Sequence, residues 1–113
     1  MDKIIFHREA VKKVLSKYKE VASRAAKTEI ENLFVFDDSS DNYTWLRFGW
    51  TNNGRLESIT TCIRLLNDKI YIEEDLTENG IANELIELGV SQKDIVLAFQ
   101  QPEMRQLTEF ALS

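Results

Sequence analysis

The sequence predicts an α+β fold: an N-terminal amphipathic helix, a four-stranded antiparallel meander, short C-terminal helices and, as an open alternative, a final strand. Three observations predict it. Apolar residues recur with helical spacing over the first 25 residues, β-rich segments joined by short links follow, and helical spacing returns after residue 80. With 113 residues and 43% hydrophobic content, we expect one domain spanning residues 1–113 around one core.

The first segment is predicted to form an amphipathic helix over residues 3–25, because its apolar residues fall on one stripe when wound at 3.6 residues per turn. Most Lys and Arg side chains lie outside that stripe. The single histidine, His7, falls on it, so we expect His7 to be packed rather than catalytic. The stripe consists of Ile4, Val11, Val14, Leu15, Tyr18, Val21, Ala22 and Ala25.

Four segments rich in β-branched and aromatic residues are predicted to be strands. The polar loop 37–42, the turn Asn52-Asn53-Gly54 and the link Asn67-Asp68 separate them. Such short connections favour antiparallel neighbours, because parallel strands need crossovers of about a dozen residues or more. The segments are Glu29 to Phe36, Tyr43 to Thr51, Arg55 to Leu66 and Lys69 to Glu73.

The C-terminal part is predicted to be mainly helical. Ile81, Leu85 and Leu88 have helical spacing, and the following glycine is a helix stop. Ser91 with an acidic residue three positions later resembles a capping box, which predicts a short third helix running into residues 95–97. Pro102 suits the first turn of another helix. Alternation over residues 108–112 is typical of a strand.

The charge is unevenly distributed. The net charge is −5 and the isoelectric point is about 4.9, which opposes non-specific binding to duplex nucleic acid. Residues 1–27 nevertheless hold eight Lys or Arg against three Asp or Glu, or +5, which leaves −10 for the remainder. Arg8, Lys12, Lys13 and Lys19 are therefore candidate contacts for nucleic acid or an acidic partner. The alternative is a solvated helix face.

Few residues suit catalysis or metal binding. One cysteine, Cys62, allows neither an internal disulfide nor a thiolate cluster, so we expect a reducing compartment. The terminus lacks the apolar stretch of a secretory signal, and no segment is apolar enough to span a bilayer, so we expect a cytoplasmic location. We also expect no metal and no cofactor. The aspartates of loop 37–42 do not have EF-hand spacing and are interpreted as turn residues.

A carboxylate cluster precedes the second predicted helix, formed by Glu73, Glu74, Asp75 and Glu78. Such a cluster is compatible with acid/base or metal-dependent catalysis. Acidic residues also favour the positive end of a helix dipole, which predicts a capping role. The four glycines form no phosphate-binding motif, so nucleotide binding is not supported.

Aromatic residues alternate along the second predicted strand so that both faces of the sheet carry rings. If Leu46, Phe48 and Trp50 face the helices together with Ile70 and Ile72, three side chains of the kinds enriched at binding hot spots lie on the outer face. These are Trp45, Arg47 and Tyr71, the predicted partner-binding residues. The outer face is also a candidate surface for homo-oligomerisation. The alternative is that loops or the C-terminal segment of the chain cover it.

The stretch from Asp68 to Ala111, DKIYIEEDLTENGIANELIELGVSQKDIVLAFQQPEMRQLTEFA, resembles the C-terminal half of the XisI family, the fdxN-element excision controlling factors of cyanobacteria. The opening helix and Phe48-Gly49-Trp50 also fit, so the resemblance covers nearly the whole chain. The sequence departs from the family where the third strand often carries polar His and Asp, because residues 62–66 read CIRLL here. Gln100 also stands where His is frequent.

The resemblance implies an α+β fold and a non-catalytic role beside XisH, a companion protein similar to restriction-type endonucleases. Together they support recombinase-mediated excision of a DNA element. The resemblance carries no established catalytic residues. The leading hypothesis is therefore an accessory or regulatory factor that binds an XisH-like protein. The alternatives are DNA binding through the basic helix and a carboxylate- or metal-dependent enzyme.

Overall fold

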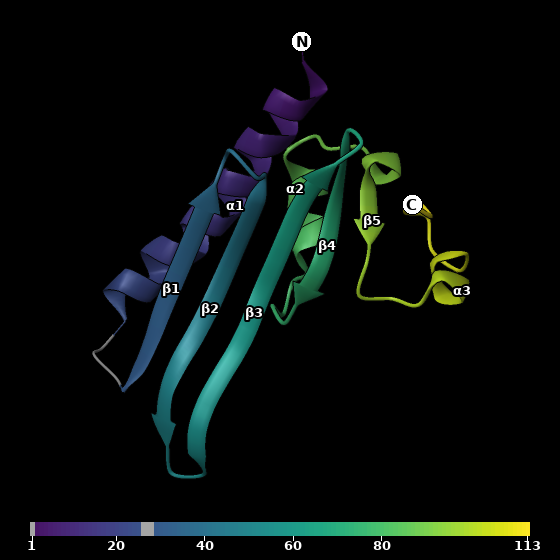
Figure 1. Ribbon diagram of the computed structural model, residues 1–113. Coiled ribbons are helices and arrows are strands. Elements are labelled where there is room, and N and C mark those ends of the chain that lie inside the picture. Colours follow the sequence, from purple (N-terminus) through teal and green to yellow (C-terminus); the bar gives the residue numbers. More distant parts are fainter. Residues whose placement is uncertain (1, 26–28) are drawn as a thin grey trace.

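The computed structural model describes residues 2–25 and 29–113. One mixed five-stranded sheet has α1 and α2 on the same face, behind the strands in Figure 1. This architecture confirms the predicted α+β class. In the described ranges, no helix combines the length and apolarity needed to cross a bilayer.

Helix α1 spans Lys3–Arg24 and agrees with the predicted amphipathic helix. It begins at Asp2, whose carboxylate accepts a hydrogen bond from the Ile4 N–H, as expected of a helix N-cap. Its fully buried Val11 and Leu15 belong to the core together with Ile63, Ile70 and other residues of the sheet. The apolar stripe therefore attaches the helix to one face of the sheet.

The first four strands form the predicted antiparallel meander, in the order β1-β2-β3-β4. Asn67 and Asp68 both have positive φ, at 55° and 62°, as a tight two-residue hairpin requires. At the other hairpin the positive φ falls on Gly54, at 116°. The strands are β1 Ile30–Asp37, β2 Asn42–Thr51, β3 Gly54–Leu66 and β4 Lys69–Asp75.

Helix α2, Ile81–Glu87, ends where the sequence predicts. The N–H of Gly89 donates to Ile86 and that of Val90 donates to Leu85, which is the hydrogen-bond pattern of a Schellman motif. Gly89 supplies the positive φ of 100° that this ending needs.

The predicted third helix is wrong beyond its first turn. Ser91 caps as expected, by accepting from the Lys93 N–H, but only a 3-10 turn follows, η1 Gln92–Asp94. Ile95–Leu97 is instead strand β5, which pairs in parallel with β4. Helix α2 thus lies on the crossover between two parallel strands, and the sheet gains a fifth strand that sequence spacing did not predict.

The C-terminal segment contains the predicted helix at Pro102, α3 Pro102–Arg105. The alternating residues after it do not form a strand and make a single bridge, between Val96 and Ala111. The Arg105 guanidinium donates to three carbonyl oxygens, of Ala98, Gln100 and Leu112. This arginine therefore ties the segment together in place of a strand ladder.

Candidate functional site

Some side chains of β2 lie on the opposite face of the sheet from the one that the sequence predicted. The ring of Trp45 stacks on Tyr18 of α1, with centroids 5.4 Å apart, and on Phe34 of β1, at 5.1 Å. Its indole N–H donates to the Asn32 side chain. The assignment of Trp45 to the outer face is therefore wrong, because the side chain lies between the sheet and α1.

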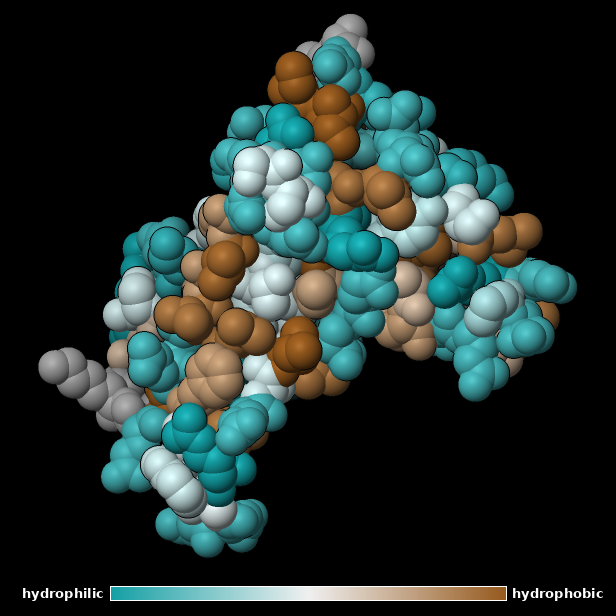
Figure 2. Space-filling model, in the orientation of Figure 1, coloured by the Kyte–Doolittle hydropathy of each residue, from teal (hydrophilic) through white to brown (hydrophobic). Residues whose placement is uncertain are grey.

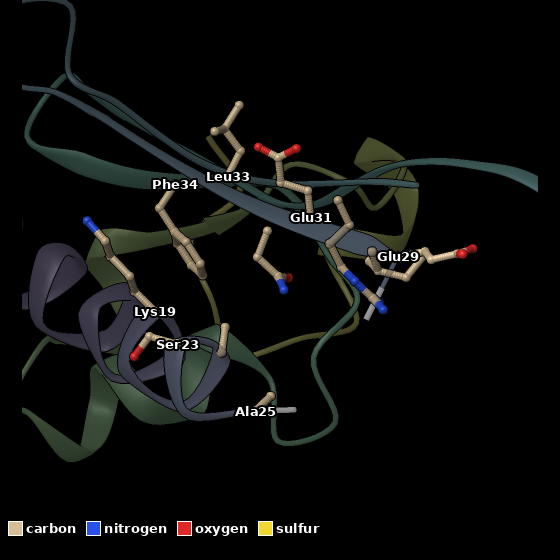
Figure 3. A pocket seen from close by; sticks show the side chains of 11 residues that line it. Lys19, Ser23, Ala25, Glu29, Glu31, Leu33 and Phe34 are labelled. Carbon is tan, nitrogen blue, oxygen red and sulfur yellow. The ribbon is translucent and has the colours of Figure 1, made fainter. Parts of the chain in front are cut away.

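Arg47 also lies on the helix side. It lines a groove with Lys19 and Ser23 of α1 and Phe34 of β1. Figure 3 shows Phe34 pointing toward α1, whereas Leu33 points to the opposite side of the strand. The assignment of Arg47 to the outer face is wrong as well.

A β-bulge in β3 explains the error. The pairing of β2 with β3 shifts between Trp45 and Leu46, where Thr60 is the extra residue. The extra residue reverses the face on either side of it, so the odd positions of β2, not the even ones, share a face with Ile70 and Ile72. Consequently Ile70 and Ile72 are buried under the helices, and Tyr71 lies on the outer face opposite Arg64.

Six apolar side chains of β1, β2 and β3 lie on the outer face of the sheet, which points away from the helices. We call them the outer patch. Cross-strand register places them on one side: Leu33 opposite Leu46, and Leu46 opposite Ile59. Both faces of the sheet therefore carry aromatic rings, but the rings of β2 on the outer face are those of the even positions, Phe48 and Trp50. The outer patch consists of Leu33, Val35, Leu46, Phe48, Trp50 and Ile59.

The structure pairs two of the four candidate basic residues with the acidic loop between β1 and β2. Arg8 donates through Nε and Nη2 to Asp41 Oδ1, at 3.1 and 2.9 Å. Lys12 Nζ lies 3.1 Å from Asp38 Oδ2. The Asp-rich loop thus serves as the internal counter-charge for the first half of α1.

The buried Tyr43 strengthens this contact from the sheet. Its hydroxyl donates to Asp38 Oδ1 at 2.7 Å. Burial, followed by this hydrogen bond, raises the pKa of Tyr43. The same hydrogen bond and then Lys12 lower the pKa of Asp38, while the hydroxyls of Ser39 and Ser40 lower the pKa of Asp37 to about 2.

The remaining candidates do not combine into a basic patch. Lys19 Nζ lies 5.9 Å from the Phe36 ring centroid. Lys13 is exposed and has no ion pair within the described part of the chain. Because Lys3, Lys17 and Arg24 also pair with carboxylates, most of the positive charge on α1 is neutralised internally.

The carboxylates before α2 do not converge on one point. Asp75 Oδ1 accepts from the N–H and hydroxyl of Thr77, and its Oδ2 accepts from the Ile81 N–H at 2.7 Å. Glu73 pairs with Arg64. Asp75 therefore has the predicted capping role. Across residues 2–25 and 29–113, no group of three or more His, Cys, Asp or Glu is placed to hold a metal ion.

A buried carboxylate, Glu84 of α2, is the main polar feature that sequence reasoning missed. It is only 6% exposed and accepts from Lys17 Nζ and the Tyr18 hydroxyl of α1. Burial, followed by the hydrogen bond to Glu84, raises the pKa of Tyr18 to about 12. The available signal was a carboxylate beside Leu85 on the apolar side of a short helix.

His7 is 1% exposed, with Nε2 3.4 Å from Asp94 Oδ2. Burial lowers its pKa below the usual 6.5, although Asp94 opposes the shift. The unfolded chain therefore takes up a proton at a higher pH than the folded chain does. We expect the free energy of unfolding to fall as the pH drops below about 6.5, by at most about 1.4 kcal/mol per pH unit.

Urea unfolding at a series of pH values measures this effect. Because the chain has one histidine, His7→Gln is expected to flatten the dependence just below about pH 6.5. If the free energy of unfolding of the variant keeps the same slope against pH, a group other than His7 causes the pH dependence.

Taken together, fold and contacts define a small α+β domain in which Asp75 caps a helix and Arg8, Lys12 and Glu73 form internal ion pairs. The family model described as XisI protein matches residues 1–112, and the chain belongs to the XisI family.

Two crystal structures from Anabaena variabilis ATCC 29413 are similar over nearly the whole chain. One is the fdxN element excision controlling factor XisI, with a TM-score of 0.86 and 34% identity, covering 99% of this chain and 100% of that chain. The other is a XisI-like protein, with a TM-score of 0.85 and 28% identity, covering 96% and 98%. No curated protein matches the chain.

Proposed function

We propose that this protein is a non-catalytic regulatory factor in DNA-element excision that acts by binding an XisH-like nuclease-fold protein. Family membership supports the regulatory role, since one similar structure is named an excision controlling factor. Three of the candidate chemical groups are engaged in the chain's own fold: Asp75 caps a helix, and Arg8 and Lys12 pair with the β1–β2 loop. The nuclease-fold partner would then supply the DNA chemistry.

The observation that carries the proposal is the charge arrangement. Internal ion pairs neutralise most of α1 and use four of the sixteen acidic residues outside residues 1–27, which leaves twelve acidic against six basic residues there. Glu78 and Glu87 are exposed at the two ends of α2, beside the exposed Asn79 and Asn83. We call these four residues the acidic surface. The positive charge of Lys17, which borders them, is paired with Glu84. A nuclease cleft that binds DNA phosphates is basic, so this surface is its electrostatic complement.

Co-purification tests the proposal directly. We expect the chain to retain an XisH-like protein at low salt and to lose it as salt rises, because screening weakens the attraction. The double variant Glu78→Lys with Glu87→Lys is expected to weaken retention at least about tenfold. Lys13→Glu is the matched control, because it changes an exposed charge on α1 and should leave retention intact.

Absence of a complex at micromolar concentration would overturn the proposal. DNA binding that Lys13→Glu abolishes would instead support the alternative, in which the free basic side chains of α1 contact phosphates.

A further inference from the structure

The outer patch is unusual for an open antiparallel sheet, whose second face is normally polar. Trp50 is 61% exposed, Ile59 53%, Val35 45% and Leu33 42%. Figure 2 shows apolar side chains gathered over β1, β2 and β3 on the face opposite α1. These side chains are adjacent by strand register, so the exposure is one continuous patch rather than scattered residues.

The charges bordering the outer patch suit a second copy of this chain. Arg55 and Glu57 lie on the same face of β3, with Nε and Oε1 3.7 Å apart, and the Arg55 guanidinium is 5.5 Å from the Trp50 ring centroid. The exposed Glu31 of β1, opposite Phe48, adds a second carboxylate to this border. A two-fold axis brings a surface against itself. A border that carries both signs side by side can therefore pair across the axis, whereas a border of one sign would repel.

The same border argues against the basic cleft of a nuclease as the occupant. Such a cleft would meet the acidic surface at α2 in preference to an apolar patch bordered by Arg55 and Glu57. The two surfaces lie on different elements, so one chain can use both.

The size of the outer patch limits how tightly two copies of the chain can bind each other. Three strands spaced by about 4.8 Å, each contributing about five residues of about 3.3 Å, give a face on the order of 240 Å² per copy. Specific interfaces bury roughly 600–1,000 Å² per partner, so this contact lies below that range. A weak dimer, populated only at high protein concentration, is therefore expected.

We infer that two copies of this chain associate face to face through the outer patch, with their sheets about 10 Å apart as in a β-sandwich. Trp50, Phe48 and Ile59 of each copy pack against the same residues of the other, and Arg55 of one copy faces Glu57 of the other. Because each chain carries a net charge of −5, association strengthens as salt screens the repulsion. The proposed nuclease complex has the opposite salt dependence, so the two proposals fail separately.

Sedimentation of the isolated chain between about 2 and 200 µM tests the dimer. The wild type is expected to shift from monomer to dimer, with a larger dimer fraction at high salt. Ile59→Lys buries an ammonium group in the contact and is expected to weaken association at least about tenfold. Leu107→Lys is the matched control, since Leu107 is 78% exposed and lies outside the outer patch.

A second readout needs no variant. Cys62 is the one cysteine, and it faces outward opposite Thr44 beside the outer patch. Its reaction with a thiol reagent is expected to slow as the protein concentration rises. A wild type that stays monomeric with unchanged Cys62 reactivity overturns the inference, as does a dimer that survives Ile59→Lys or is lost in Leu107→Lys. Retention of the nuclease-fold protein that Ile59→Lys abolishes would overturn it in favour of a heteromeric contact.

Discussion

Replacing Trp45 with alanine is expected to lower the free energy of unfolding by about 2–4 kcal/mol, slightly below the usual cost for a fully buried tryptophan because this ring is half-buried. The ring stacks on Tyr18 and Phe34, so its removal leaves a cavity between α1 and the sheet. The variant also loses the hydrogen bond from the indole N–H to Asn32. Urea denaturation monitored by circular dichroism measures the change.

Trp50→Ala is the matched control, because the chain contains two tryptophans and Trp50 is 61% exposed. We expect it to cost less than about 1 kcal/mol at a concentration where the chain is monomeric. A larger loss for Trp50→Ala than for Trp45→Ala would mean that the faces of β2 are assigned the wrong way round.

Glu84→Gln is expected to destabilise the fold by about 1–3 kcal/mol, because the buried carboxylate accepts charge-assisted hydrogen bonds from two α1 side chains. It should also lower the pKa of Tyr18 from about 12, though not fully to 10, because burial of the phenol remains. Chemical denaturation gives the first quantity, and the absorbance of tyrosinate during alkaline titration gives the second.

Glu87→Gln provides the comparison, since Glu87 is an exposed carboxylate on the same helix. A change within about 0.5 kcal/mol is expected there. If both variants behave alike, Glu84 contributes no more than a surface charge.

Local chemistry predicted much of the fold. The Asn67-Asp68 turn, the Asp2 cap and the glycine after α2 each act over a few neighbouring residues, so their signals can be recognised in sequence. Strand β5 was missed because three residues of parallel pairing depend on β4, which lies more than twenty residues earlier. The local capping signal at Ser91 was correct but ended after one 3-10 turn.

The candidate site was harder to predict than the fold. Alternation along one strand divides its side chains into two sets, but only the pairing register with the neighbouring strands decides which set faces the helices. The extra residue Thr60 in β3 changes which positions of β2 share a face with Ile70 and Ile72 of β4. Trp45 and Arg47 were consequently assigned to the wrong side, although rings do project from both. The ion pairs of Arg8 and Lys12 with the β1–β2 loop span 33 and 26 residues, a separation that no helical pattern reveals.

Calorimetric titration of the purified chain into an XisH-like protein tests the central claim most directly. The predicted result is a saturable complex that weakens at least about tenfold when Glu78 and Glu87 are both replaced by lysine, with affinity for the nuclease-fold protein unchanged in Lys13→Glu. No heat with that protein, or equal affinity for the charge-reversed chain, would contradict the account.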